Sequence, residues 1–186
     1  MSEKEEIRRK IVETAKEIIT EDGYEILSMR KIAARIDYSA GIIYHYFKDK
    51  QEIADIVCRE YLEEINEILG ENEEESPERE FFVVLKRYIT VLVTNPLKYG
   101  ALFDMKNMKI IEEQSDNPIL KRIEDILRSA EDQAIFRKLE IGIAAKTVLV
   151  AANGVAAQII NEKSGEEYGK KLIDHYLYIL FKGMLK

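Results

Sequence analysis

The residues best placed to do chemistry lie close together near the N-terminus. Ser28 and Ser39 are of a type that begins helices, and Gly41 lets a backbone approach a partner closely. Tyr44 and Tyr46 each combine an apolar ring with a hydroxyl that can reach a phosphate or the edge of a base. Serine, glycine and tyrosine at this spacing favour a surface that binds nucleic acid.

The sequence contains no convincing catalytic or metal-binding group. His45 and His175 lie in unrelated segments, and no serine or cysteine has a plausible base partner. The acidic spacing near Glu60 and Glu64 lacks histidine and cysteine, so it indicates a solvated helix face. Cys58 is single, which excludes an internal disulfide, and we interpret it as a buried small side chain, with a redox switch as the alternative. We expect no enzymatic activity, no cofactor and no metal.

The overall composition is that of a globular protein. Of its 186 residues, 46% are hydrophobic and 34% are charged, and the formal net charge is −7. An acidic total permits DNA binding, because phosphates respond to nearby charge, and residues 28–50 carry five basic side chains against two acidic ones. No stretch approaches the roughly 18 uncharged apolar residues of a membrane span, and the first residues lack the apolar region of a signal peptide. We therefore expect a cytoplasmic protein with no membrane partner.

The elements that must position the N-terminal residues are predicted to be helices. Apolar residues recur on one face of residues 7–19, and Gly23 marks the end of this first helix. Short helices are expected after Ser28 and after Ser39, each of which serves as an N-cap. A long helix with one apolar stripe follows over residues 49–69.

Proline and glycine mark the boundaries of the helices expected in the rest of the chain. Helix starts are predicted at Ser76-Pro77, Asn95-Pro96 and Asn117-Pro118, because proline at the first helical position loses no hydrogen bond. Another helix is expected from about 140 to 162, and Ser164-Gly165 separates it from the last one. No alternating strand pattern is evident. The sequence therefore predicts an all-α fold of nine helices.

Two short helices joined by a few residues are typical of a helix-turn-helix, whose second helix enters the major groove of DNA. Here the residues resemble the TetR family of bacterial and archaeal regulators, over roughly residues 7 to 60. The residues that carry the resemblance are Gly23, Tyr24, Ile32, Ala33, Ser39, Gly41, Tyr44, Phe47, Lys50 and Ile53. The resemblance implies a homodimer with three head helices, a connecting fourth helix and a ligand-binding body. We therefore expect a DNA-binding domain at 1–48 and a ligand-binding and dimerisation domain at 49–186.

The same resemblance implies DNA contacts in the head. Ile42 stands where the family often has threonine, so a contact to a thymine methyl group replaces a hydrogen bond there. His45 is a candidate for sequence choice, Arg30 is expected to position a phosphate more than to read a base, and Tyr44 could combine a core and a phosphate role. The predicted DNA-binding residues are Ser28, Arg30, Lys31, Ser39, Ala40, Gly41, Ile42, Tyr44, His45, Tyr46 and Lys50.

The body is expected to dimerise and to hold a ligand. Two apolar helices per subunit would form a four-helix interface, although the same residues could simply be buried within one chain. The predicted interface residues are Leu149, Ala152, Ala156, Ile159, Leu172, Tyr176, Ile179 and Leu180. Aromatic and methionine side chains suit an adaptable apolar pocket, with plain core as the alternative. The predicted ligand-binding residues are Tyr61, Tyr88, Leu92, Tyr99, Leu102, Phe103, Met105 and Met108.

These patterns predict a ligand-responsive transcriptional regulator that binds a palindromic operator in double-stranded DNA as a homodimer. We expect a repressor that a small, largely apolar effector releases, with the helix over 49–69 moving one head against the other. The alternative hypothesis is a helical protein–protein interaction module that uses the head as its surface.

Overall fold

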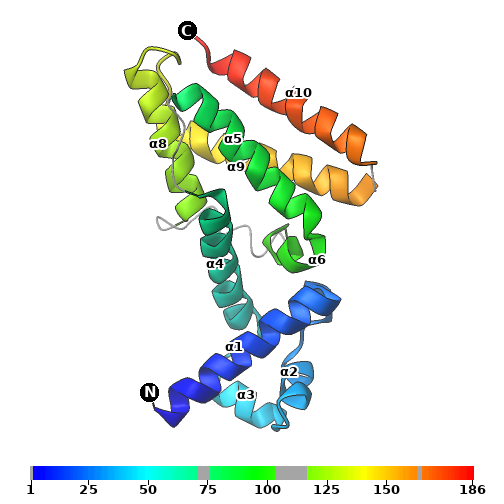
Figure 1. The fold of residues 1–186 in the computed structure, drawn as a ribbon. Helices are drawn as coiled ribbons and strands as arrows, with labels where there is room; N and C mark the ends of the chain where they lie inside the picture. The colour runs from blue at the N-terminus through cyan, green and yellow to red at the C-terminus, as the bar shows by residue number, and fades with distance from the viewer. Residues whose placement is uncertain (1, 71–75, 104–116, 163–164) are drawn as a thin grey trace. The chain divides into compact units, whose positions relative to one another are not determined.

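The computed structural model of the chain describes residues 2–70, 76–103, 117–162 and 165–186, without the side chains of Ala101 and Phe103. Over this described part the chain forms nine α-helices and two short 3₁₀ turns, with no strand, which confirms the predicted all-α fold (Figure 1). Two compact units are present. The head unit comprises Met1–Tyr61 and Asn95–Glu113, and the body unit comprises Leu62–Thr94 and Gln114–Lys186.

The head unit begins with α1, Glu3–Asp22, whose start is closed by a complete capping box between Ser2 and Glu5. Its end lies at Gly23, where φ of 85° and ψ of 163° define a conformation that is essentially restricted to glycine. The 3₁₀ turn η1, Tyr24–Ile26, follows. These features fix where α1 stops and where the chain turns back.

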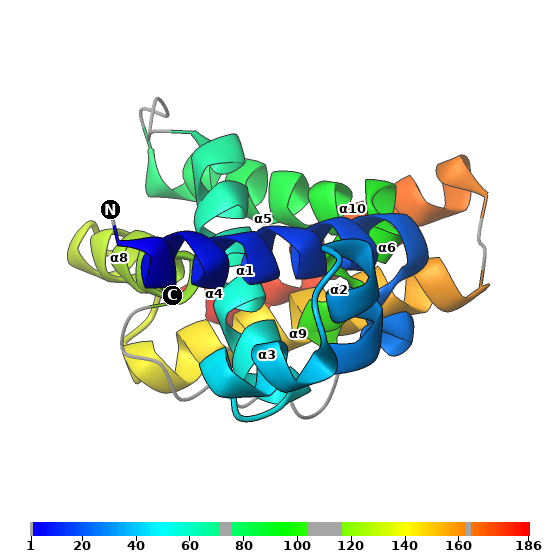
Figure 2. The same ribbon diagram turned by 90° about the horizontal axis from the view of Figure 1, so that it is seen from below.

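Three further helices complete the first part of the head unit. They are α2, Met29–Arg35, α3, Ala40–Tyr46, and the start of α4, Lys50–Leu69. In Figure 2, which is viewed from below, α1, α2 and α3 are turned towards the viewer. The long helix α4 is continuous, and its residues up to Tyr61 belong to the head unit while those from Leu62 belong to the body unit.

Proline begins three of the later helices, as the sequence predicted. They are α5, Pro77–Thr94, α6, Pro96–Tyr99, and α8, Pro118–Asp132. Asn117 caps α8 by accepting from the N–H groups of Ile119 and Leu120 at 3.0 and 3.1 Å. Asn95 occupies the same position before α6, but its side chain makes no capping hydrogen bond. The asparagine–proline pattern therefore predicted the starts of both α6 and α8, although only Asn117 caps its helix through the side chain.

The body unit is built on α5 and α8 with two long C-terminal helices, α9, Ile141–Glu162, and α10, Glu166–Met184 (Figure 1). The turn η2, Gly100–Phe103, follows α6 in the head unit. By length and composition α9 could cross a membrane, which the sequence reading did not anticipate. It packs instead against α5, α8 and α10, and Ala145, Ala152 and Ala156 are completely buried there. The buried face of α9 is thus part of the core of the body unit.

Candidate nucleic-acid interface

The turn between α2 and α3 depends on one residue with an unusual backbone. Asp37 has φ of 59°, in the left-handed region that aspartate and asparagine tolerate better than most side chains. The N–H of Tyr38 then donates to the carbonyl of Ala33 at 2.9 Å. The chain consequently leaves α2 and enters α3 within a few residues, as a helix-turn-helix requires.

A small apolar core holds α2 and α3 in place. Ile32 and Ile43 are completely buried, Ala33 is 3% exposed and Phe47 is 1% exposed. The guanidinium group of Arg8, on α1, lies 4.8 Å from the centre of the Phe47 ring, which adds a cation–π contact to the packing. Because these side chains are used inside the head, the remaining face of α3 is presented outward.

That outward face carries large side chains that the head itself does not bury. Ile42 is 38% exposed and Tyr44 is 58% exposed, and Gly41 and His45 are exposed beside them. The ring of Tyr46 is half-buried and lies edge-on to His45 at 5.3 Å between ring centres. Ser39 occupies the N-cap position of α3 without making the predicted side-chain cap. An exposed isoleucine and tyrosine on a seven-residue helix suit contact with a partner surface.

Two of the predicted DNA-binding cations are used inside the head. Nζ of Lys31 lies 2.7 Å from Oδ2 of Asp22, and this hydrogen bond is the main reason that the pKa of Asp22 lies below its ordinary value of 3.8. Nζ of Lys50 donates to the carbonyl of Tyr24 at 3.2 Å and lies 4.1 Å from the centre of the same tyrosine ring. Both lysines therefore join segments of the head, and any DNA contact they make competes with these internal partners.

The beginning of α2 combines a cap with an exposed cation. Oγ of Ser28 accepts from the N–H of Lys31 at 3.2 Å, which makes Ser28 the N-cap that the sequence predicted. Arg30, in the first turn, is exposed. Nη1 of Arg35, at the end of α2, lies 2.8 Å from Oε2 of Glu21 on α1. Of the three cations of α2, Lys31 and Arg35 are thus held in ion pairs within the head unit, and Arg30 is exposed.

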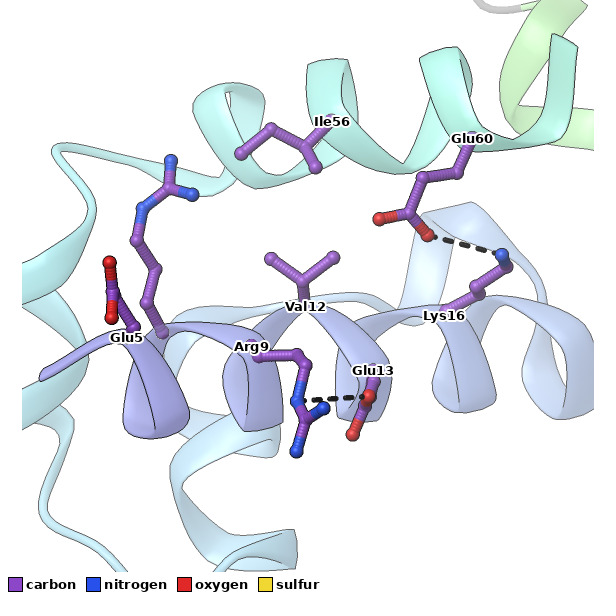
Figure 3. A pocket seen from close by; sticks show the side chains of 8 residues that line it. Glu5, Arg9, Val12, Glu13, Lys16, Ile56 and Glu60 are labelled. Carbon is purple, nitrogen blue, oxygen red and sulfur yellow. Dashed lines mark hydrogen bonds and ion pairs between the residues drawn. The ribbon is translucent and has the colours of Figure 1, made fainter. Parts of the chain in front are cut away.

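An open groove of about 480 Å³ lies between α1 and α4 within the head unit (Figure 3). Val12 and Ile56 form its apolar part, and charges of both signs lie around them. Nζ of Lys16 donates to Oε2 of Glu60 at 3.1 Å, and other acids, Glu5 and Glu13, line the same groove. Because its cations are accompanied by carboxylates, this groove lacks the uniform positive charge that a phosphate backbone favours.

The predicted ligand-binding residues are divided between the two units. Tyr61, Tyr99 and Leu102 are buried in the head unit, where the Tyr61 and Tyr99 rings pack edge-on with 5.5 Å between their centres. Tyr88 and Leu92 are completely buried in the body unit. The side chain of Phe103, together with Met105 and Met108, lies outside the described residues.

A buried polar pair lies within the body unit, between α5 and α9. Oη of Tyr88 donates to Oδ1 of Asn153 at 2.7 Å, and Asn153 is only 5% exposed. Burial raises the pKa of Tyr88 well above its ordinary value of 10, so its hydroxyl keeps its proton and acts as a donor. Burial raises the pKa of Tyr176 in the same way, and its hydroxyl donates to the carbonyl of Val148 at 2.9 Å. Sequence reasoning selected Tyr88 but missed its partner on α9.

The predicted interface residues differ in burial between α9 and α10. Leu149, Ala152, Ala156 and Ile159 are at most 5% exposed within the single chain, so their side chains pack against the protomer's own helices. Their burial agrees with the alternative that they pack within one chain, and their part in a dimer interface stays a prediction. Leu172, Tyr176 and Leu180 are half-buried on α10, and Ile179 is exposed.

Other apolar side chains on the same two helices point outward. Ile143 and Val150 on α9 are 60% and 43% exposed, and Tyr168 and Ile179 on α10 are 54% and 56% exposed. Their spacing of seven on α9 and eleven on α10 places each pair on one helix face. Sequence reasoning did not single out Ile143 and Val150, because α9 is apolar on more than one face and periodicity alone did not distinguish core from surface.

Comparison with known proteins gives a family match for the head. Residues 11–56 match the family model described as bacterial regulatory proteins, tetR family. The fatty acid metabolism regulator protein of Bacillus subtilis is 27% identical over 130 residues, which cover 68% of this chain and 67% of that protein. The HTH-type transcriptional repressor AcnR of Corynebacterium diphtheriae is 32% identical over 65 residues, which cover 35% of this chain and 34% of that protein.

Solved structures share the fold over nearly the whole chain. The transcriptional regulator FadR from Bacillus subtilis, in complex with stearoyl-CoA, has a TM-score of 0.71 at 19% identity and covers 95% of this chain and 98% of its own. The fatty acid degradation regulator FadR from Bacillus halodurans has a TM-score of 0.70 at 16% identity, with 98% and 97% covered. At these identities the likeness concerns the fold.

Proposed function

Because the chain belongs to the TetR family of transcriptional regulators, we propose that it is a ligand-responsive repressor that binds a palindromic operator as a homodimer. The observation that carries the proposal is the outward face of α3, where Ile42 and Tyr44 are exposed although the opposite face is buried. A helix that is held so firmly and is apolar on its exposed side suits insertion into a major groove. The family's regulators are not enzymes.

The operator contacts are proposed to divide into two kinds. Ile42, Tyr44 and His45 lie on the exposed face of α3 and would meet base edges, and Arg30, at the start of α2, would hold a flanking phosphate. The other residues proposed to approach the DNA backbone, from the two short helices, their N-caps and the start of α4, are Ser28, Lys31, Ser39, Ala40, Gly41, Tyr46 and Lys50. Sequence preference would thus depend on α3, and most of the salt dependence on the cations around it.

The homodimer is proposed to form through the outward faces of α9 and α10. Ile143, Val150, Tyr168 and Ile179 are large apolar side chains that the single chain leaves exposed. Paired with the same residues of a second copy, they would form a four-helix interface about a two-fold axis. A two-fold dimer would place two recognition helices on the two halves of a palindrome.

The effector is proposed to be a fatty acyl-CoA thioester. The fatty acid metabolism regulator of Bacillus subtilis supports this choice, as does the FadR structure that contains stearoyl-CoA. In this chain the long acyl group would lie among the apolar body residues near Tyr88 and Leu92, and only this part of the molecule corresponds to the largely apolar effector expected from the sequence. Release from DNA requires that the effector bind more tightly to a form whose two heads do not fit the operator than to the form that does fit it. An effector with equal affinity for both forms would not change their populations.

A DNase footprint on the DNA upstream of the protein's own coding sequence tests the proposal. We expect protection of a palindrome, with a dissociation constant on the order of 10⁻⁸ M or lower and strong weakening as salt rises. Stearoyl-CoA should abolish the footprint, whereas free coenzyme A and stearate serve as controls. A protein without salt-sensitive binding to any duplex would contradict the proposed function, and a footprint that persists with stearoyl-CoA would contradict the proposed effector.

A further inference from the structure

The last backbone carbonyl groups of α4 have no partner within the helix and need donors from outside it. Gly70, directly after the helix, has φ of +72°, and its N–H donates to the carbonyl of Glu67 at 2.9 Å. Two arginines from other helices of the body unit complete this end. Nη1 of Arg87, on α5, donates to the carbonyl of Leu69 at 3.1 Å, and Nη1 of Arg122, on α8, donates to the carbonyl of Gly70.

Arg122 is held in this position by a second contact. Its Nη2 lies 3.7 Å from Oε1 of Glu80 on α5, and the two side chains are only 15% and 9% exposed. The end of a helix carries a partial negative charge, so two guanidinium groups are favourable there. Little solvent screens the Arg122–Glu80 pair. Through this pair and its hydrogen bond to Gly70, Arg122 of α8 links the end of α4 to α5. We call Arg87 and Arg122, with the two carbonyls that they bind, the arginine clamp.

We propose that the arginine clamp positions α4 for the effector response, by passing a shift of α5 and α8 to the end of α4. This inference rests on the proposed function, because it presumes an effector that moves body helices. α4 runs without interruption from Lys50 to Leu69, and its residues up to Tyr61 belong to the head unit. With its last carbonyl groups bound by two guanidinium groups, α4 is expected to move as one rigid helix. A lysine in place of either arginine would offer only a point charge.

If the arginine clamp has this role, its removal should weaken the coupling between stearoyl-CoA and the operator without weakening the binding of either one alone. Coupling is the factor by which stearoyl-CoA raises the dissociation constant of the operator, and values of roughly 5- to 150-fold are typical. In R87Q/R122K we expect this factor to fall at least about fivefold, with R87Q intermediate. The dissociation constants for stearoyl-CoA alone, and for the operator without effector, should each stay within about twofold of wild type. A purely structural role would lower the unfolding temperature and leave the coupling factor unchanged.

A matched control is available on the same helix. Lys86 neighbours Arg87 on α5, is exposed, and lies 2.6 Å from Asp174 of α10 through its own ion pair. Lys86→Gln also removes one cation and one cross-helix contact, but it does not touch the end of α4, so its coupling factor should equal that of wild type. R87Q retains the Arg122–Glu80 pair, which protects the fold if the double variant is unstable.

Hydrogen–deuterium exchange tests the clamp without an effector. Amides of residues 63–69 should exchange faster in R87Q/R122K than in the Lys86→Gln control, and unchanged exchange would overturn the inference whatever the effector is. Full coupling in the double variant, with stearoyl-CoA still bound, would also overturn it. If stearoyl-CoA fails to release wild-type protein from DNA, the proposed effector is wrong, and the exchange experiment still tests whether the two arginines hold the end of α4, which the inference requires.

Discussion

Nζ of Lys31 donates to Oδ2 of Asp22 across 2.7 Å, which ties α2 to the last residue of α1. The pair reduces the positive charge that Lys31 can offer to DNA, whereas Arg30, one residue earlier, is exposed. Arg30→Ala should therefore weaken operator binding and lower the slope of log affinity against log salt by about one, as expected for one lost phosphate contact. Lys31→Ala should change the slope less. Fluorescence anisotropy at several salt concentrations measures both, and equal slopes would contradict the distinction.

Neutralising the carboxylate should have the opposite effect on DNA binding. In Asp22→Asn the ammonium group of Lys31 loses its ionic partner, so the affinity for any duplex should rise, most visibly at low salt. The pKa of Asp22 lies below its ordinary value, mainly through the Lys31 hydrogen bond. The ion pair is therefore complete above the ordinary value of 3.8 and is lost as pH falls through the lowered one. Asp22→Asn should remove this part of the acid unfolding curve, as followed by circular dichroism.

Ile42 provides a test of base readout that is separate from charge. Its side chain is 38% exposed on α3 and contributes no charge, so Ile42→Ala should weaken operator binding without altering the salt slope. Loss of a contact to a thymine methyl should weaken binding by about 1 kcal/mol when the preferred base is present and by little when another base takes its place. Binding to operators with each base pair substituted in turn would reveal the affected position. A uniform loss over all operators would instead assign Ile42 to general packing.

How far the sequence predicted the structure can be argued from particular residues. Helix starts at Pro77, Pro96 and Pro118 were predictable because proline's constraint is local. The pairing of Lys50 with Tyr24, and of Arg122 with Gly70, joins residues far apart in the chain, and no local pattern encodes such contacts. The return of the segment that begins at Asn95 to the head unit was missed for the same reason.

The proposed dimer makes a prediction about exposed isoleucine and valine. Val150→Glu/Ile179→Glu places two charges on faces proposed to be buried by a second copy, so it should yield a monomer at micromolar concentration. Ile26, 49% exposed in the head, is the matched control, and Ile26→Glu should remain dimeric. Sedimentation velocity distinguishes the species. A stable dimer of the double variant would place the interface elsewhere.

The stability of the turn between α2 and α3 should depend on how readily residue 37 adopts a positive φ. Asp37 has φ of 59°, which glycine adopts without strain and a β-branched residue adopts only at a cost of about 1–2 kcal/mol. Asp37→Gly should leave the unfolding temperature of the head unchanged or higher, and Asp37→Val should lower it. Operator affinity should follow the same order, because Ser39 and α3 come directly after this turn. Equal thermal stability of the two variants would show that the turn adapts.

The Tyr88–Asn153 hydrogen bond allows a structural role to be separated from a role in effector binding. Tyr88→Phe removes the donor and leaves the buried amide oxygen of Asn153 unpaired, which should cost about 1–3 kcal/mol of unfolding free energy. The double variant Y88F/N153L removes both polar groups and should recover much of that loss, because a buried apolar pair needs no partner. If the pair serves only the core, the double variant should bind stearoyl-CoA as wild type does. If Tyr88 meets the effector, the double variant should be stable and yet bind stearoyl-CoA more weakly, as isothermal titration calorimetry would measure.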